Sequence, residues 1–353
     1  MPSNVVLVTG VGGELGGKLL ARLGSNEQLE RVIGVDTVPP SQWLVDRMGR
    51  AEFVRADIRN PLIERIIADA GVDTVVHASM TAHPAGPEPR VAVKDTNIIG
   101  TMRLFAACQR SPRVRKLVVK STAAVYGAGP RSQAVFTEDS PLKPASSRGY
   151  VSDAIDMEGY IRGLRRRRPD LTVTTARFAN LMGPAVDTVL TRYFALPVVP
   201  TIFGYDARMQ FVHSADALAV LEQATMRDIP GTFNVAADGV IMLSQAIRLA
   251  GRVELPVPSS ALPTVAPILR GAKLVDFSPD QIQLLTYGRV VDTTKLEQEF
   301  GYAPRWTTRE AFDDYVRGRA LGPVVDRESL AALAGKVATS AVSGQTSGRA
   351  QPR

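Results

Sequence analysis

The residues best suited to chemistry lie near the start of the chain, in the stretch VVLVTGVGGELGG at positions 5–17. An apolar, β-branched run predicts a buried strand, and Gly10, Gly13 and Gly16 follow it before a helical pattern that lasts until Gly24. A strand that turns through glycines into a helix leaves backbone N–H groups free at the positive helix end, where a pyrophosphate can bind. The glycines also let the phosphates approach without a Cβ in the way. This spacing predicts an anion site.

An acidic residue follows at the distance that dinucleotide binding requires. A second apolar run at positions 32–35 ends in Asp36, 20 residues after Gly16. A carboxylate there can accept a hydrogen bond from the ribose 2′-hydroxyl of adenosine. The two features together predict a dinucleotide site, and Asp36 favours NAD over NADP because it would repel a 2′-phosphate. The alternative is a strand–turn–helix unit without a ligand.

The segments that must hold this site alternate between strand and helix. Strands are expected at 5–8, 32–36, 52–54, 73–77, 116–119 and 171–175, and helices at 18–23, 61–70, 91–110 and 150–168. Such alternation is typical of an α/β fold with a parallel, doubly wound (Rossmann) sheet. Prolines interrupt the later part of the chain, which predicts a smaller C-terminal lobe over the carboxyl ends of the strands.

Three regions follow from this pattern. Residues 1–177 are expected to form the NAD-binding core, and residues 178–322 a substrate lobe that is partly interleaved with the same sheet. Small and polar residues without periodicity predict a disordered tail at 335–353.

Composition excludes several classes of protein. A single cysteine, Cys108, allows no disulfide within the chain, so a reducing cytoplasm is expected, and its apolar surroundings predict a core residue. No apolar run reaches the length of a membrane span, and a signal peptide before the first strand is not expected. The net charge of +7 is moderate, and its densest patch, at 165–168, lies at an expected helix end, which favours a structural role over nucleic-acid binding. The histidines show no metal-ligand spacing, and His77 and His213 are expected to be hydrogen-bonded near the core.

Ordered matches to one family run through residues 4–320. The matching segments are 9–16, Asp36, 57–58, 76–79, Asn97 with 100–101, 121–127, Tyr150, 177–180 with 183–184, 211–213 with Asp216, and 231–235. In these segments the chain resembles the extended short-chain dehydrogenases/reductases of the NAD-dependent epimerase/dehydratase type, and it is similar to the UDP-glucose 4-epimerases. The order of the matches adds to the dinucleotide pattern derived from the residues alone.

The resemblance implies a cofactor site, a catalytic pair and a substrate. NAD is expected to contact Gly10, Gly12, Gly13, Glu14, Leu15, Gly16, Asp36, Asp57, Ile58, Ala78, Ser79, Asn97 and Tyr150. Tyr150 is expected to take a proton from a substrate alcohol while the hydroxyl of Thr122 holds the oxygen. The substrate is expected to be a small molecule, such as a nucleotide sugar, that contacts Thr122, Asn180 and Arg208.

Two positions depart from the family pattern. The lysine expected one helical turn after the tyrosine is Ala154. Lowering a tyrosine pKa from ~10 to ~7 takes about 4 kcal/mol of differential stabilisation, and nearby Asp153 and Asp156 would oppose it. The remaining cations, Lys120 and Arg148, cannot be placed from sequence.

The second departure is on the substrate side. The arginine expected two residues before Phe211 is Met209, with Arg208 adjacent. Either a shift in register brings Arg208 to the diphosphate or that contact is absent. Asn180 keeps the family position, although a turn-forming role for it, and a strand-end ion pair for Arg177, are equally open.

Two functions therefore remain open. One is an NAD-dependent epimerase, dehydratase or reductase that acts through Tyr150 and Thr122. The other is an NAD-binding protein of the same fold with weakened catalysis, which works as a sensor or a partner-docking subunit. A homodimer is also expected, because the helices at 91–110 and 150–168 carry surplus apolar residues and match the family's usual dimer helices.

Overall fold

The computed structural model describes residues 4–80, 96–143, 149–258 and 278–323. Four sequence predictions lie wholly or partly outside these residues: the proline-rich segment 84–89, the first part of the helix at 91–110, the position of Arg148 and the tail at 335–353.

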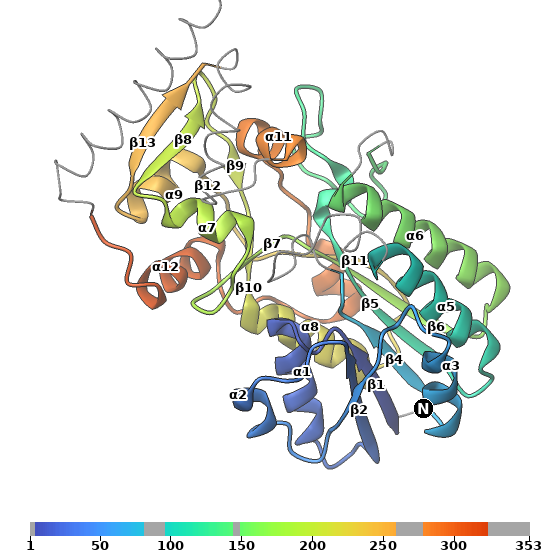
Figure 1. Ribbon diagram of the computed structural model, residues 1–353. Helices are drawn as coiled ribbons and strands as arrows, with labels where there is room; N and C mark the ends of the chain where they lie inside the picture. Colours follow the sequence, from blue (N-terminus) through green and yellow to red (C-terminus); the bar gives the residue numbers. More distant parts are fainter. Residues whose placement is uncertain (1–3, 81–95, 144–148, 259–277, 324–353) are drawn as a thin grey trace, which may run out of the picture.

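The predicted α/β fold with a parallel sheet is confirmed. Seven strands form one parallel sheet in the order β11-β6-β5-β4-β1-β2-β3 (Figure 1). Their bounds are Val5–Thr9 (β1), Arg31–Asp36 (β2), Glu52–Arg55 (β3), Thr74–His77 (β4), Lys116–Thr122 (β5), Thr172–Phe178 (β6) and Gly231–Val235 (β11). The winding reverses between β1 and β4, and open α/β sheets bind ligands at the carboxyl ends of the strands beside such a reversal.

Helices cover both faces of this sheet. One face carries α3 (Leu62–Asp69), α5 (Thr101–Arg110) and α6 (Tyr150–Arg167), and the other carries α1 (Glu14–Gly24) and α8 (Ser214–Met226). Successive side chains of each strand point to opposite faces of the sheet. In β1, Leu7 packs on the face with α3, α5 and α6, whereas Val6 and Val8 pack on the face with α1 and α8.

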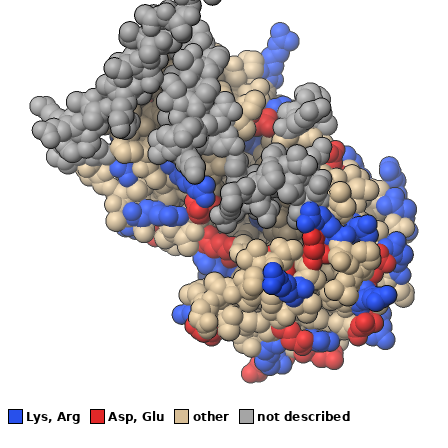
Figure 2. Space-filling view, viewed as in Figure 1, with Lys and Arg blue, Asp and Glu red and all other residues tan. Residues whose placement is uncertain are grey.

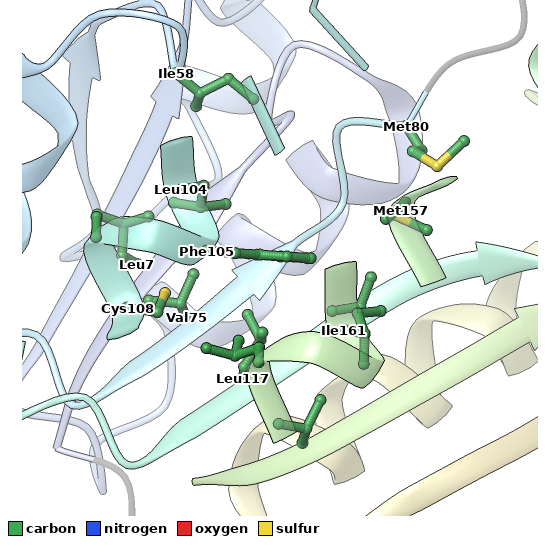
Figure 3. Packing of buried hydrophobic residues seen from close by; sticks show 14 of the residues in the cluster. Leu7, Ile58, Val75, Met80, Leu104, Phe105, Cys108, Leu117, Met157 and Ile161 are labelled. Carbon is green, nitrogen blue, oxygen red and sulfur yellow. The ribbon is translucent and has the colours of Figure 1, made fainter. Parts of the chain in front are cut away.

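The core beneath α5 and α6 is continuous and apolar (Figure 3). Leu7 of β1 and Val75 of β4 pack against Leu104 and Phe105 of α5. Cys108, on the same helix, is fully buried, which confirms its prediction as a core residue. These contacts hold α5 against the central strands of the sheet.

The later part of the chain forms a second group of elements. Three two-stranded sheets pair β7 (Asn180–Met182) with β10 (Phe211–His213), β9 (Arg208–Met209) with β12 (Ile241–Met242), and β8 (Val198–Ile202) with β13 (Val253–Val257). Their helices are α7 (Val189–Ala195), α9 (Leu243–Leu249), α11 (Pro279–Tyr287) and α12 (Thr308–Gly318). Aromatic side chains such as Phe194, Phe211 and Phe312 fill a separate core here. Because β11 returns to the large sheet, this lobe and the sheet are interleaved in the chain.

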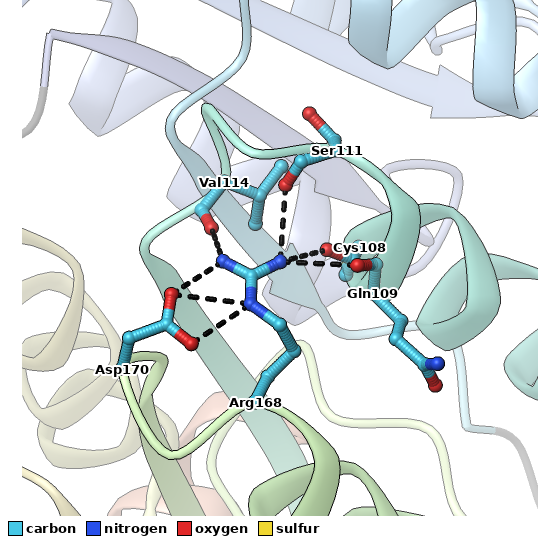
Figure 4. Close-up of polar contacts among 6 residues, drawn as sticks. All are labelled: Cys108, Gln109, Ser111, Val114, Arg168 and Asp170. Atoms are coloured by element: carbon cyan, nitrogen blue, oxygen red, sulfur yellow. Dashed lines mark hydrogen bonds and ion pairs between the residues drawn. The ribbon is translucent and has the colours of Figure 1, made fainter.

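The basic run at the end of α6 is structural. The Arg168 guanidinium donates to the Asp170 carboxylate and to four main-chain carbonyls at and beyond the end of α5 (Figure 4). The carbonyls belong to Cys108, Gln109, Ser111 and Val114. Arg165 likewise donates to the carbonyls of Val173 and Gly231. Arg165 and Arg168 thus join α6 to α5 and to the adjacent strands, in agreement with the structural role predicted for this basic run.

Charges of both signs are spread over the surface. Figure 2 shows Lys and Arg side chains interspersed with Asp and Glu on one face of the molecule. Arg31 and Glu52 pair across β2 and β3 at 2.8 Å, and the hydrogen bond from Arg31 lowers the pKa of the Glu52 carboxyl. No helix in the described part of the chain is long and apolar enough to cross a membrane.

Candidate functional site

The glycine-rich turn after β1 has a backbone that only glycine adopts without strain. Gly10 has a φ of +79°, and its N–H donates to the Val35 carbonyl at 3.1 Å. A Cβ on Gly10 would lie 2.5 Å from the Cα of Ser79, so the turn and the segment after β4 touch directly. A Cβ on Gly16 would collide with the Gly10 carbonyl. The two glycines hold the turn against the start of α1 and against β4.

The N-terminus of α1 fits an anion. Gly12 and Gly13 are exposed, and Gly13, the capping residue, has no side chain to accept the first N–H groups of the helix. The Glu14 carboxylate, in the first turn of the helix, forms an ion pair with the Lys18 ammonium at 2.6 Å. The exposed turn and the uncapped helix end therefore suit the pyrophosphate that the sequence predicts here.

Asp36 lies beside this turn, at the end of β2. Its Oδ2 accepts the Gly12 N–H at 2.9 Å and its Oδ1 accepts the Val38 N–H at 3.1 Å. A carboxylate has about four acceptor positions, so lone pairs remain for a ribose hydroxyl. The structure brings Asp36 and the glycine turn together as the fingerprint requires.

The end of β4 is held by a neutral histidine. His77 is buried, and its ring nitrogens lie 2.9 Å from the hydroxyls of Thr9 and Thr101. Burial, with a smaller effect from the Lys120 charge, lowers the pKa of His77 to about 3. The predicted core role of His77 is confirmed. His213 is also buried and hydrogen-bonded, to the Asp314 carboxylate.

The two residues expected near adenine follow β3. Asp57 is bound by Arg59, whose Nε and Nη2 lie 2.9 and 2.6 Å from Oδ2. Partial burial alone would raise the pKa of the Asp57 carboxyl, but the hydrogen bonds and charge of Arg59 outweigh it and lower that pKa. Ile58 is buried against Gly100. The carboxylate of Asp57 is therefore engaged by its own loop.

Tyr150 and Thr122 come together from distant parts of the chain. Tyr150 is the first residue of α6 and Thr122 is the last residue of β5, and the two hydroxyls lie close enough for Thr122 to act on the ionisation of Tyr150. Burial raises the pKa of Tyr150, and the charge of Asp153 adds to this rise. The Thr122 hydroxyl and the charge of Arg289 oppose this rise without reversing its net direction.

The first turns of α6 offer no cation to Tyr150. Ala154 is fully buried in the apolar core, and Asp153 accepts a hydrogen bond from Nδ2 of Asn97 at 3.1 Å. Asp153 therefore acts on Tyr150 as predicted, whereas the charge of Asp156 raises the pKa of Tyr160 instead. Asn97 is thus hydrogen-bonded to Asp153, which lies in the same helix turn as Tyr150.

A small pocket opens beside this pair, where β5 and β6 end. It is lined by Ala123, Phe178, Ala179, Asn180, Gln210, Arg289 and Val291. Ala123 directly follows Thr122, so the pocket and the hydroxyl pair adjoin. Burial lowers the pKa of Arg289 to about 10, and its Nε has no hydrogen-bond partner among the described residues. Because an unpaired buried donor is costly, this guanidinium is suited to an anionic ligand.

Sequence reasoning missed Arg289 and selected Arg208 instead. The Arg208 side chain is exposed and donates to the Ala134 carbonyl at 2.7 Å, outside the residues that line the pocket. Met209 points the other way and is fully buried. The main chains of Arg208 and Arg289 are adjacent, since the Arg289 N–H donates to the Arg208 carbonyl at 3.1 Å. The only signal in the sequence was a lone arginine between Gly288 and two valines.

Arg177 forms the strand-end ion pair that the sequence left open. Its Nη2 lies 2.6 Å from Oε2 of Glu158, and both side chains are buried. Burial alone would lower the pKa of Arg177, but the hydrogen bonds and charge of Glu158 raise it. Ser121 and Tyr126 complete this buried network, which holds β5, β6 and α6 together beneath the site.

No group of His, Cys, Asp and Glu side chains within the described residues has the arrangement of a metal site. The polar groups of the site are the glycine turn, Asp36, the Tyr150–Thr122 pair and the pocket with Asn180 and Arg289. Together they suit a dinucleotide and a hydroxylated, anionic substrate rather than a metal.

Comparison with known proteins agrees with this geometry. Residues 6–236 match the model of the NAD dependent epimerase/dehydratase family. The chain belongs to this family. A protein of Mycobacterium tuberculosis that is described only as uncharacterized is 51% identical over 332 residues, which cover 94% of this chain and 88% of that protein. The UDP-glucose 4-epimerase of Mycolicibacterium smegmatis is 29% identical over 188 residues, covering 51% of this chain and 57% of the enzyme.

Solved structures of epimerases and dehydratases share the fold. A UDP-glucose-4-epimerase of Stenotrophomonas maltophila with bound NAD and formylated UDP-arabinopyranose has a TM-score of 0.69 at 20% identity, covering 90% of this chain and 98% of that one. The dTDP-glucose 4,6-dehydratase of Bacillus anthracis in complex with NAD has a TM-score of 0.68 at 20% identity, covering 90% and 97%. The arrangement of one sheet and a smaller C-terminal lobe is thus the arrangement of this epimerase/dehydratase fold.

Proposed function

We propose that this member of the family binds NAD and oxidises or reduces a hydroxyl-bearing carbon of a nucleotide sugar or a similar substrate, in the manner of an epimerase or dehydratase. One observation carries the proposal. The neighbouring hydroxyls of Tyr150 and Thr122 adjoin a pocket that contains Asn180 and an arginine, Arg289, with an unpaired buried donor. A proton-transfer group and an anion-binding group in one site suit a substrate with both a hydroxyl and a phosphate.

The cofactor would be held by residues that the structure already brings together. The pyrophosphate would lie on the exposed turn at Gly12 and Gly13, and the adenosine ribose would bond Asp36. When bound, NAD would supply the hydride acceptor and donor. The carboxylate of Asp36 would exclude a 2′-phosphate by charge repulsion, which is why we propose NAD rather than NADP.

The chain's own residues would handle the proton. The Tyr150 hydroxyl would accept the proton of the substrate alcohol, and Thr122 would orient the substrate oxygen by a hydrogen bond. Arg289 would stabilise the phenolate because its charge already lowers the cost of ionising Tyr150. Arg289 thus stands in for part of what a lysine at Ala154 would do.

The substrate would be recognised through its phosphates. Arg289 and Asn180 both line the pocket and can donate several hydrogen bonds, which is the chemistry that binds a diphosphate. The structural neighbour from Thermotoga maritima, a UDP-glucose 4-epimerase, was solved with UDP-glucose. A UDP-sugar is therefore the first substrate class to test.

A matched pair of arginines tests the substrate site. Arg289→Met removes the guanidinium in the pocket, and Arg208→Met removes an exposed guanidinium whose main chain is adjacent. We expect UDP affinity, measured by calorimetry, to fall about tenfold or more in the first variant, the loss typical of a charged hydrogen bond. The second variant should bind UDP as the wild type does. The reverse result would move the phosphate site to the exposed position.

The alternative is an NAD-binding protein with weakened catalysis. Ala154 favours it, because the raised pKa of Tyr150 leaves little phenolate at neutral pH. Turnover that is equal in wild type and Tyr150→Phe would support this alternative. We place either activity in the cytoplasm.

We also propose a homodimer through the face formed by α5 and α6. These helices pack side by side on the sheet, and Ile99, just before α5, and Met102, in its first turn, are 43% and 47% exposed. An exposed apolar surface on the helices that the family uses for dimerisation would be covered by the same surface of a second copy.

A further inference from the structure

Lys120 carries a charge that the described structure does not neutralise. It lies on β5, two residues before Thr122. The residue before it, Val119, pairs with His77, the last residue of β4. Its Nζ donates to the Met80 carbonyl at 3.1 Å, and no carboxylate among the described residues pairs with it. Burial lowers the pKa of the Lys120 ammonium to about 8. An ammonium has three donors, and within the described residues two of them remain available to a ligand.

The position of this ammonium is tied to the glycine turn. Met80 follows Ala78 and Ser79, and those two residues pack directly against Gly10. A Cβ on Gly10 would lie 2.6 Å from the Ser79 nitrogen. The ammonium of Lys120 therefore lies beside the segment that forms one wall of the pyrophosphate turn.

The sheet order determines where the second half of a dinucleotide must go. The turn follows β1, and Asp36, the ribose partner on the adenosine side, ends β2. Since β2 lies on one side of β1 and β4 on the other, the nicotinamide side must extend across β4 toward β5. Strands are about 4.8 Å apart, so β5 lies about 10 Å from β1, within reach of the far ribose.

We propose that Lys120, delivered from β5, binds the nicotinamide-side ribose of the dinucleotide and so supplies at the cofactor the cation that α6 lacks at Ala154. This inference rests on the proposed NAD binding. The hydroxyls of that ribose would accept the two free donors of the ammonium. In this arrangement Lys120 binds the cofactor and Arg289 stabilises the phenolate of Tyr150. Two cations thus share the role of the single lysine that the family pattern has at position 154.

A purely structural role for Lys120 makes a different prediction. If the ammonium only anchors the Met80 carbonyl, its removal would disturb residues 78–80, which pack against Gly10. The affinity for every ligand that binds at the glycine turn would then fall by the same factor. A role at the far ribose weakens only ligands that contain it. ADP-ribose contains this ribose and ADP does not, so the two ligands separate the roles.

The experiment is a calorimetric titration of NAD⁺, ADP-ribose and ADP into wild type, Lys120→Met and Lys120→Gln. Glutamine keeps a donor for the Met80 carbonyl and removes the charge, so it guards against misfolding of the methionine variant. Lys295→Met is the control, since the Lys295 ammonium lies over the Phe233 ring and pairs with the Glu299 carboxylate at 3.9 Å. We expect both Lys120 variants to bind NAD⁺ and ADP-ribose about tenfold or more weakly, with ADP affinity unchanged and the control like wild type.

The outcomes separate this inference from the proposed function. Unchanged affinity for ADP-ribose in Lys120→Gln, or an equal loss for ADP and ADP-ribose, would overturn the role of Lys120 while NAD binding stands. A wild-type protein that binds none of the three ligands would overturn NAD binding, and the inference with it.

Discussion

Gly10 combines a positive φ with a close main-chain approach in the proposed dinucleotide site, so an alanine there should damage both stability and NAD binding. Gly10 has a φ of +79°, a conformation that costs an L-residue about 1–2 kcal/mol. Its new Cβ would also lie 2.5 Å from Ser79 Cα and 2.8 Å from the Ala78 carbonyl carbon. Carbon atoms pack at about 3.5–4.0 Å, so the turn and the segment after β4 would have to separate by about 1 Å.

The chain contains a matched control for this substitution. Gly239 also has a φ of +79°, but nothing lies within 4 Å of a Cβ built on it. Gly239→Ala should therefore cost only the backbone strain, about 1–2 kcal/mol. Gly10→Ala adds overpacking of about 1–3 kcal/mol, for a total of about 2–5 kcal/mol.

Urea unfolding of both variants measures the difference in the free energy of unfolding, and calorimetry measures NAD⁺ affinity. We expect Gly10→Ala to be the less stable variant and to lose most of its NAD⁺ affinity, because the separated segments both line the proposed cofactor site. Gly239→Ala should bind NAD⁺ normally. Equal stability losses together with unchanged NAD⁺ affinity in Gly10→Ala would refute the close approach on which the site depends.

Four further predictions address selectivity, catalysis, packing and assembly. Asp36→Ser should raise NADP⁺ affinity relative to NAD⁺, because it removes the charge that repels a 2′-phosphate; tighter NADP⁺ binding by the wild type would contradict this. Burial raises the pKa of Tyr150, so turnover that needs its phenolate should increase toward alkaline pH. Ala154→Lys should shift the pH–rate profile to lower pH, and a flat profile would count against Tyr150 as the base. Arg168→Ala should lower the free energy of unfolding by about 2 kcal/mol because main-chain carbonyls lose a charged donor, and a neutral result in urea unfolding would show that water replaces it. Met102→Lys should shift light scattering from dimer to monomer, whereas a wild-type monomer at micromolar concentration would refute the dimer.

Local patterns predicted the part of the site that is built locally. The glycine turn and Asp36 depend on one strand–turn–helix unit and the strand that follows it, and periodicity reveals both. Thr122 and Tyr150 became recognisable only through their family resemblance, because no local property shows that the end of β5 meets the start of α6.

The substrate side depended on contacts that sequence does not contain. Arg208 and Met209 alternate on a two-residue strand, and its pairing with β12 decides which one faces inward. Arg289 reaches the pocket because its segment pairs with that same strand from far along the chain. The use of Lys120 likewise depends on the Met80 carbonyl and the order of the strands.

The most direct test of the account is the near-ultraviolet absorbance of reduced nicotinamide after candidate UDP-sugars are added to the NAD⁺-loaded protein. We expect at least one UDP-sugar to reduce the bound NAD⁺ in the wild type, faster at alkaline pH, and none to do so in Tyr150→Phe. Reduction that is unchanged in Tyr150→Phe, or a wild-type protein that binds NAD⁺ and UDP-sugars without any reduction at any pH, would contradict it.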